Sequence, residues 1–118
     1  MSTALKTKTK WIKFLKEEEF PEDLGVCIKH DELQIAVFNF KSMNQWYAAE
    51  NRCPHNKEMV IGRGILGDAS GRPKITCAMH KRSFSLNTGK CLNDESVEDI
   101  QIFEVKVEDG YVYIKLPE

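Results

Sequence analysis

The sequence contains little that would place the chain in a membrane, in a secretory pathway or on nucleic acid. No stretch approaches the roughly 18 consecutive apolar residues of a transmembrane helix. Residues Met1 to Lys10 are polar and lack the apolar run of a secretory signal. With 17 basic and 18 acidic residues the net charge is −1, so no strong positive field is present to attract nucleic acid or anionic lipid. We expect a cytoplasmic protein.

Internal repeats, low-complexity linkers and a hydrolytic set of Ser, His and acid are also missing. A chain of 118 residues supports one hydrophobic core and is too short for a second domain. The length therefore predicts a single domain covering residues 1–118. Helical periodicity is nearly absent, and only Asp94 to Asp99 hints at a helical turn.

Two short motifs stand out against this background, Cys53-Pro54-His55 and Cys77-Ala78-Met79-His80. Each offers one thiolate and one imidazole in the same order, so each can give its Cys to one iron and its His to another. This is the pattern of a Rieske [2Fe–2S] centre, in which two His replace two Cys on a single iron. Two ferric irons, two sulfides and two thiolates sum to zero charge, which makes reduction easier than in an all-Cys cluster. We predict that Cys53, His55, Cys77 and His80 bind such a cluster.

Two other interpretations of the motifs remain open. Zinc also accepts two Cys and two His, but zinc sites usually begin with two Cys separated by two to four residues, and a one-residue Cys-x-His gap is unusual there. The second alternative is a degenerate site, in which the chain has kept the four residues but they bind no metal.

Strand-like alternation covers most of the chain. Residues 26–28 and 33–40 are apolar runs on either side of His30-Asp31-Glu32, which predicts a hairpin. The segment around Asp109-Gly110 alternates on both sides, and Asp-Gly in that setting is the strongest short-range hairpin signal. The pattern predicts an all-β, Rieske-like iron–sulfur domain: a small antiparallel β-sandwich with cluster-binding loops at one tip.

One motif points to a ligand that the sequence around it excludes. Residues 62–67 match G-x-G-x-x-G, a dinucleotide fingerprint that works only where it opens a helix in a βαβ unit. Asp68, Ser70, Gly71 and Pro73 follow, so no helix can begin there. The glycines are expected to bend a long connection between the two Cys/His motifs, and no NAD site is predicted.

The remaining candidates receive structural interpretations. Cys27 and Cys91 can in principle pair, but a cytoplasmic setting favours buried free thiols. His30 is expected in a turn, and Trp46 and Tyr47 are expected in the core. Basic residues near the motifs form either a solvated rim or a docking face for an acidic redox partner; they are Lys57, Arg63, Arg72, Lys81 and Arg82.

The residues in and around both motifs resemble the small subunit of assimilatory NAD(P)H-dependent nitrite reductase. The matching segments are 46–48, 51–55, 63–68 and 77–89, and the resemblance extends from Trp11 to the final strand. Residues 56–76, 21 in number, separate His55 from Cys77, which is longer than the usual gap in Rieske ferredoxins. His80-Lys81 stands where those ferredoxins commonly have His-Gly.

This resemblance implies a large-subunit partner that carries FAD, a [4Fe–4S] cluster and sirohaem and reduces nitrite to ammonia. Some family members have the fold without the ligands, whereas this sequence keeps all four. The resemblance therefore assigns Cys53 and Cys77 to one iron and His55 and His80 to the other. The partner would determine whether NADH or NADPH is used.

Departures from respiratory Rieske proteins bear on the reduction potential. The extra Cys pair that forms a disulfide beside the cluster in those proteins corresponds to Glu58 and Met79 here, so that disulfide cannot form. The Ser and Tyr whose hydroxyls donate hydrogen bonds to sulfur correspond to Arg82 and Phe84. Arginine and phenylalanine have no hydroxyl, so these two hydrogen bonds, which stabilise the reduced cluster, are missing here. We therefore expect a reduction potential of about −150 mV, the low end of the Rieske range.

Three functions stay open at this point. The first is the small subunit of a nitrite reductase, with no catalysis by the chain alone. The second is a free Rieske ferredoxin that donates electrons to an oxygenase, for which a His-Gly motif and a shorter gap would be expected. The third is a cluster-free binding module on a Rieske-like scaffold.

Overall fold

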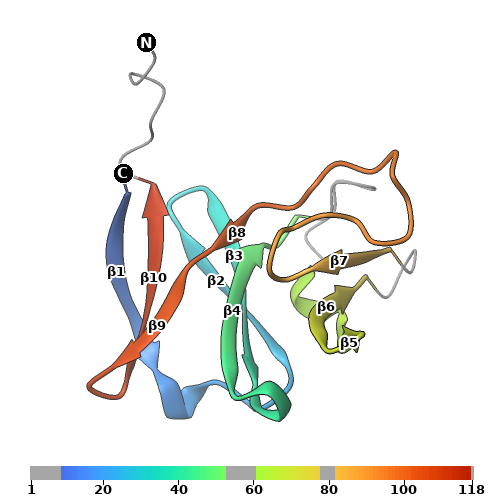
Figure 1. Cartoon of the computed structure of the whole chain (residues 1–118). Helices are drawn as coiled ribbons and strands as arrows, with labels where there is room; N and C mark the ends of the chain where they lie inside the picture. Colours follow the sequence, from blue (N-terminus) through green and yellow to red (C-terminus); the bar gives the residue numbers. More distant parts are fainter. Residues whose placement is uncertain (1–8, 53–60, 78–81, 118) are drawn as a thin grey trace.

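The computed structural model describes residues 9–52, 61–77 and 82–117. These ranges contain ten strands and three single-turn 3-10 helices (Figure 1): β1 Thr9–Lys16, η2 Glu17–Glu19, β2 Gly25–His30, β3 Leu33–Phe40, η3 Lys41–Met43, β4 Gln45–Glu50, η4 Ile61–Arg63, β5 Ile65–Ala69, β6 Arg72–Thr76, β7 Ser83–Ser85, β8 Ile102–Phe103, β9 Val105–Glu108 and β10 Tyr111–Pro117. No helix within these ranges is long and apolar enough to span a membrane. The predicted all-β fold is confirmed.

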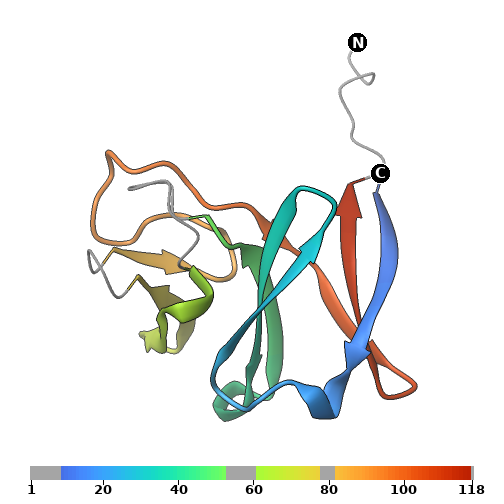
Figure 2. The same ribbon diagram turned by 180° about the vertical axis from the view of Figure 1, so that it is seen from behind.

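The strands form three antiparallel sheets, in the orders β1-β10-β9, β2-β3-β4-β8 and β5-β6-β7. The four-stranded sheet lies between the other two (Figures 1 and 2). β8 pairs with β4, and β9 pairs with β10. The chain therefore passes from the middle sheet to the outer one at Glu104. We call β1–β4 and β8–β10 the body, and η4, β5–β7 and residues 86–101 the small lobe.

Strand β3 shows that the middle sheet is covered on both faces. Residues 35–38 are all fully buried. Ile35 and Val37 belong to the core on the β10 side, whereas Ala36 and Phe38 belong to the core on the β6 side. Because side chains alternate across a strand, an uninterrupted apolar run needs apolar cover on both sides.

Strand β10 supplies much of the body core by alternation. Val112, Ile114 and Leu116 are fully buried and pack with Phe103, while the residues between them are half-buried. Trp46 packs against this same core.

The second core joins the body to the small lobe. It contains Ala36, Phe38 and Ala49 from the body, and the small lobe contributes Ile61, Ile75, Cys77, Phe84, Leu86 and Ile100. Tyr47 packs against this second core. The two neighbouring aromatic residues of β4 thus pack against opposite cores, which confirms the prediction for Trp46 and Tyr47.

Both predicted hairpins are present. β2 and β3 pair across Asp31-Glu32, with Asp31 in the left-handed region (φ +55°). β9 and β10 pair across Asp109-Gly110, where both residues have positive φ (+53° and +80°), as a type I′ turn requires. Because side chains alternate along a strand, residues 112, 114 and 116 of β10 face the same side.

As predicted, no helix begins after the glycine-rich segment. Gly62 and Arg63 complete the single turn of η4, and strand β5 begins at Ile65 with no helix after it. Residues 94–99 also form no helix. They contain one turn in which the Val97 N–H donates to the Asp94 carbonyl oxygen (3.2 Å).

Candidate metal centre

Cys77 is the predicted ligand that lies among the described residues. It directly follows β6, is fully buried, and is a free cysteine in the core that joins body and small lobe. The other three predicted ligands, Cys53, His55 and His80, lie outside the described ranges. Within those ranges no group of three or more His, Cys, Asp or Glu side chains could hold a metal ion, so the assignment of all four ligands stays a prediction.

The structure fixes the two ends of the segment that carries His80. The Cys77 N–H donates to the Arg82 carbonyl oxygen at 2.8 Å, so these residues face each other at the end of the β6–β7 hairpin. The hydroxyls of Thr76 and Ser83 lie 2.8 Å apart on the adjacent pair. Four residues, 78–81, connect Cys77 to Arg82.

The segment that carries Cys53 and His55 returns to the same core. The Ile61 N–H donates to the Asn51 carbonyl oxygen at 3.0 Å, which joins the two sides of this segment. Ile61 is fully buried and belongs to the same core as Cys77. Gly64 allows this approach, because a Cβ there would lie 2.5 Å from the Thr76 carbonyl oxygen. The described ends of both predicted ligand segments are therefore anchored on one apolar core.

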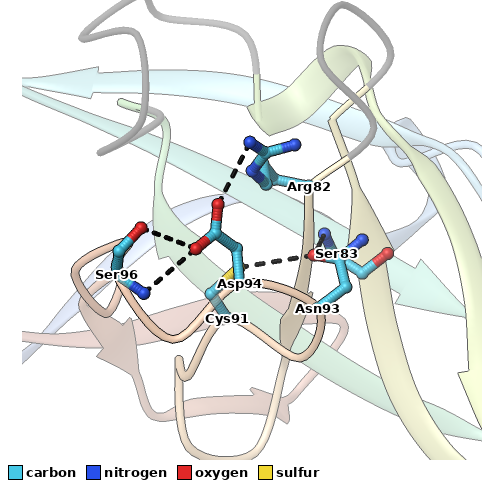
Figure 3. A network of polar contacts seen from close by, with 6 residues as sticks. All are labelled: Arg82, Ser83, Cys91, Asn93, Asp94 and Ser96. Atoms are coloured by element: carbon cyan, nitrogen blue, oxygen red, sulfur yellow. Dashed lines mark hydrogen bonds and ion pairs between the residues drawn. The ribbon is translucent and has the colours of Figure 1, made fainter.

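A polar network supports the Arg82 end of the second segment (Figure 3). The Arg82 guanidinium lies 3.1 Å from Asp94 Oδ2, with both side chains about 30% exposed. Ser96 donates its backbone N–H (3.0 Å) and its hydroxyl (2.6 Å) to Asp94 Oδ1. These Ser96 hydrogen bonds, with a further contribution from the Arg82 charge, lower the pKa of the Asp94 carboxyl. Asp94 is thus held ionised opposite Arg82.

The same loop is also hydrogen-bonded to strand β7. The Ser83 N–H donates to Asn93 Oδ1 (3.2 Å), and the Leu92 N–H donates to the Ser83 carbonyl oxygen (2.7 Å). The Cys91 thiol donates to Asn93 Oδ1 at 3.5 Å. Residues 91–96 therefore form a support along β7 and against Arg82, the first described residue after His80.

Arg82 is not a solvated rim residue, which was one of the two interpretations left open for the basic residues. Its guanidinium is partly buried and paired with Asp94, so its charge is largely neutralised locally. Arg63 and Arg72 are exposed, as a rim requires. Lys57 and Lys81 lie outside the described residues.

The two spare cysteines do not pair, but the prediction that both are buried is wrong. Cys27 is exposed and Cys91 is half-buried, and both are free. Partial burial of the Cys27 thiol raises its pKa, so it stays protonated at neutral pH. His30 is the last residue of β2, beside the turn, with Nε2 3.9 Å from Asp31 Oδ2. Among the described residues, neither these cysteines nor His30 belongs to a group of three or more His, Cys, Asp or Glu side chains that could hold a metal ion.

The residues present fit a [2Fe–2S] cluster. Cys77 is a free thiol excluded from water at the end of a strand, and a solvent-shielded thiolate is the donor such clusters use. The complete donor set, two thiolates and two imidazoles, matches the mixed ligation of a Rieske centre.

Comparison with known proteins agrees with this interpretation. Residues 10–115 match the model of the Rieske-like [2Fe-2S] domain. The chain belongs to the Rieske-like [2Fe-2S] domain family. It is 36% identical over 116 residues to nitrite reductase [NAD(P)H] of Emericella nidulans, covering 91% of this chain and 10% of that protein. The chain thus spans about a tenth of that relative.

Two further relatives of this Rieske-like domain are informative. The solution structure of the nitrite reductase [NAD(P)H] small subunit from Erwinia carotovora superposes with a TM-score of 0.76 at 28% identity, covering 92% of this chain and 82% of that one. The 3-phenylpropionate/cinnamic acid dioxygenase ferredoxin subunit of Photorhabdus laumondii is 32% identical, covering 86% of this chain and 90% of that one. The family thus includes both named functions that the sequence left open.

Sequence reasoning missed the polar residues that support the two segments. Asn51, Asn93 and Asp94 contact residues far from them in the sequence or belong to irregular loops, so no periodic pattern marks them. The available signal was local: Asp94-Glu95-Ser96 is an Asx-turn sequence, and Asn51 stands two residues before the first predicted ligand.

Proposed function

We propose that the chain binds a Rieske [2Fe–2S] cluster and serves as the electron-transfer small subunit of a cytoplasmic NAD(P)H-dependent nitrite reductase. Cys53 and Cys77 would hold one iron, and His55 and His80 the other. A bound cluster of this kind accepts and releases one electron at a time.

The observation that carries the proposal is the common anchoring of the two Cys/His segments. Cys77 and Ile61 lie in one buried core, and each segment is closed by a backbone hydrogen bond, Cys77 to Arg82 and Ile61 to Asn51. Two thiolates and two imidazoles therefore come from two short segments that leave one small region of the fold. An unused pair of motifs would not require this arrangement. A zinc site would require it too, but the one-residue spacing of Cys53-Pro54-His55 is unusual for zinc and favours the cluster.

The chain is proposed to transfer electrons rather than to reduce nitrite by itself. Four protein ligands leave a two-iron cluster no open position for nitrite. The glycine-rich segment is a 3-10 turn followed by a strand, so it offers no helix N-terminus to a nicotinamide dinucleotide. The reduction of nitrite to ammonia would belong to a large subunit with FAD, [4Fe–4S] and sirohaem. The fungal relative, in which the matching segment is 10% of a nitrite reductase, supports such a partner.

The reduction potential is proposed to lie near the low end of the Rieske range, about −150 mV. Position 84, where a Tyr hydroxyl would donate a hydrogen bond, holds the buried phenyl ring of Phe84. Position 82 holds an arginine whose guanidinium is engaged by Asp94. Neither side chain supplies a hydroxyl, and the Arg82 charge is compensated, so little stabilises the reduced cluster electrostatically. A clearly positive value in a redox titration would contradict this proposal.

A ferredoxin for an oxygenase is the second candidate, and one observation favours it. The dioxygenase ferredoxin subunit matches nearly its full length at 32% identity. The long gap between the motifs and His80-Lys81 favour the nitrite reductase assignment instead.

The first experiment tests the cluster and its ligands. Protein reconstituted anaerobically with iron and sulfide should be reddish-brown and, when reduced, give the low average g value of a Rieske centre. Cys77→Ser should abolish the signal, whereas the matched control Cys91→Ser should keep it, because Cys91 lies outside the motifs. Colourless protein with one bound zinc would overturn the proposal.

The second experiment tests the partner. NAD(P)H-dependent ammonia formation by the large subunit should rise when this chain is added, and the chain alone should form none. Full activity of the large subunit without the chain would reject the electron-transfer role. Support of dioxygenase turnover instead would select the ferredoxin.

A further inference from the structure

Asn51 lies between strand β4 and the first predicted ligand, Cys53, and its side chain is almost fully buried (4% exposed). Its backbone N–H donates to the Gln34 carbonyl oxygen in β3 (2.9 Å), and its carbonyl oxygen accepts from the Ile61 N–H (3.0 Å). The backbone of this one residue is therefore bonded both to the body and to the far side of the segment that carries Cys53.

The Asn51 side chain repeats this connection. Its Oδ1 accepts a hydrogen bond from the Gly62 N–H at 2.6 Å. Because a backbone N–H only donates, the accepting atom must be the oxygen, and this fixes the orientation of the amide. Nδ2 then faces Gln34 Oε1 and Cys27 Sγ, each at 3.4 Å. One buried amide thus links strands β2 and β3 to η4.

The surrounding glycines leave room for this link. A Cβ on Gly62 would lie 3.1 Å from Asn51 Oδ1, and a Cβ on Gly25 would overlap the Gly62 carbonyl oxygen. The η4 turn therefore packs backbone to backbone against β2. This close packing makes the position of η4 depend on small residues and on the Asn51 amide rather than on apolar side chains alone.

We infer that Asn51 is the positioning residue of the first ligand segment, an inference that rests on the ligand assignment proposed above. By holding residues 51, 61 and 62 together, it closes the segment before any metal is bound. The ordering of Cys53 and His55 then costs less conformational entropy when the cluster assembles, and the closed segment starts from the core that contains Cys77.

The test compares Asn51→Ala with Ser85→Ala. Ser85 is a matched control because it is a buried polar residue of the small lobe (8% exposed) whose hydroxyl also accepts backbone hydrogen bonds, from Asn87 and Thr88. Those bonds close the turn after β7 and not a ligand segment. Asn51→Ala should release iron to a chelator about 10- to 100-fold faster than wild type, while Ser85→Ala should stay close to wild type.

Asn51→Asp supplies a readout that a merely structural role would not give. Its carboxylate keeps an acceptor for the Gly62 N–H, and the Cys27 thiol and a rotated Gln34 amide can donate to its second oxygen. It should therefore restore slow iron release. Its added negative charge should also shift the reduction potential downward, because the reduced cluster is the more negative form.

The outcomes separate this inference from the proposed function. A wild-type protein that takes up no cluster would overturn the proposed function and this inference with it. A wild type that binds the cluster, together with equal iron release by Asn51→Ala and Ser85→Ala, would overturn the inference alone. In iron-free protein, amide exchange at Gly62 should accelerate in Asn51→Ala only, and unchanged exchange there would likewise reject the inference.

Discussion

The body and the small lobe are stabilised by different kinds of interaction. In the body, strands of up to eight residues pair along their length, and alternate side chains from two sheets fill a core that includes Ile35, Val37 and Ile114. In the small lobe the strands have only five, five and three residues. There, in addition to the apolar core shared with the body, buried or half-buried polar side chains accept hydrogen bonds near the strand ends, as at Ser85 and Asp94. Asn51 does the same where the body joins η4.

This difference follows from what each region must present. Apolar alternation specifies a layer well but leaves no side chain free for chemistry. A metal site needs two irregular segments held at defined places, and irregular backbone must find hydrogen bonds outside the strand ladders. Short polar side chains such as Asn51 and Asp94 provide them. The body therefore acts as a scaffold on which the small lobe can be polar and irregular.

The largest expected effect tests how much a fully buried position of the body core contributes to stability. Ile114→Ala removes a fully buried side chain from the body core, and we expect a loss of about 2–5 kcal/mol in the free energy of unfolding. Urea titration measures it. The matched control is Ile65→Ala in the small lobe, where the side chain is 66% exposed and the change should be within about 0.5 kcal/mol. Equal losses would contradict the comparison.

The second prediction concerns the polar support of the small lobe. Asp94→Asn removes the charge that faces Arg82, so the Arg82 end of the second ligand segment should loosen. We expect iron release about three- to tenfold faster, with little change in the unfolding transition of the body. Arg82→Met should have a similar effect, and the double variant should be no worse than either single one, because both remove the same ion pair. Additive effects would show that the pair is not the cause.

The two regions also differ in how well the sequence predicts them. The hairpins at Asp31 and at Asp109-Gly110, and the alternation of β10, follow from residue types within a few positions of one another, so local patterns predict them. The strand run at residues 35–38 is visible as apolar, but its burial by two different layers is not. Covering elements that lie far away in the sequence decide that burial.

The supporting contacts of the metal centre are harder to predict for the same reason. Asn51 reaches Cys27, Gln34 and Gly62, which are 24, 17 and 11 positions away. Arg82 was grouped with the basic residues of a rim or docking face because its pairing with Asp94 across a loop leaves no periodic signal in the sequence. The ligand motifs, by contrast, combine rare residue types at tight spacing, so the sequence alone singles them out.

The third prediction uses the lowered pKa of Asp94. Ser96 and Arg82 favour its ionised form in the folded state. The carboxylate therefore contributes stability that is fully present above the unfolded pKa, about 3.9, and is lost as the pH falls through the lower folded pKa. In iron-free protein, the protection of residues 91–97 against amide exchange, relative to the intrinsic rate at each pH, should fall below about pH 4. Asp94→Asn should lack this step, and an identical step in the variant would assign it to another group.

The smallest expected effect tests whether the small lobe, and not the body, faces the redox partner. Arg63 is exposed on η4 in the small lobe, whereas Lys13 is exposed on β1 at the opposite side of the body. If the large subunit approaches the metal centre, Arg63→Glu should slow electron exchange about two- to fivefold at low salt, because exposed charges steer encounter. The difference should disappear at high salt, where screening is complete within a few ångströms. Lys13→Glu carries the same change in net charge and should leave the rate unaltered, so stopped-flow reduction of the two variants by the large subunit separates local steering from overall charge.

An equal slowing of electron exchange by both variants would mean that net charge alone governs the encounter. A slowing by Lys13→Glu only would place the partner on the β1 face of the body.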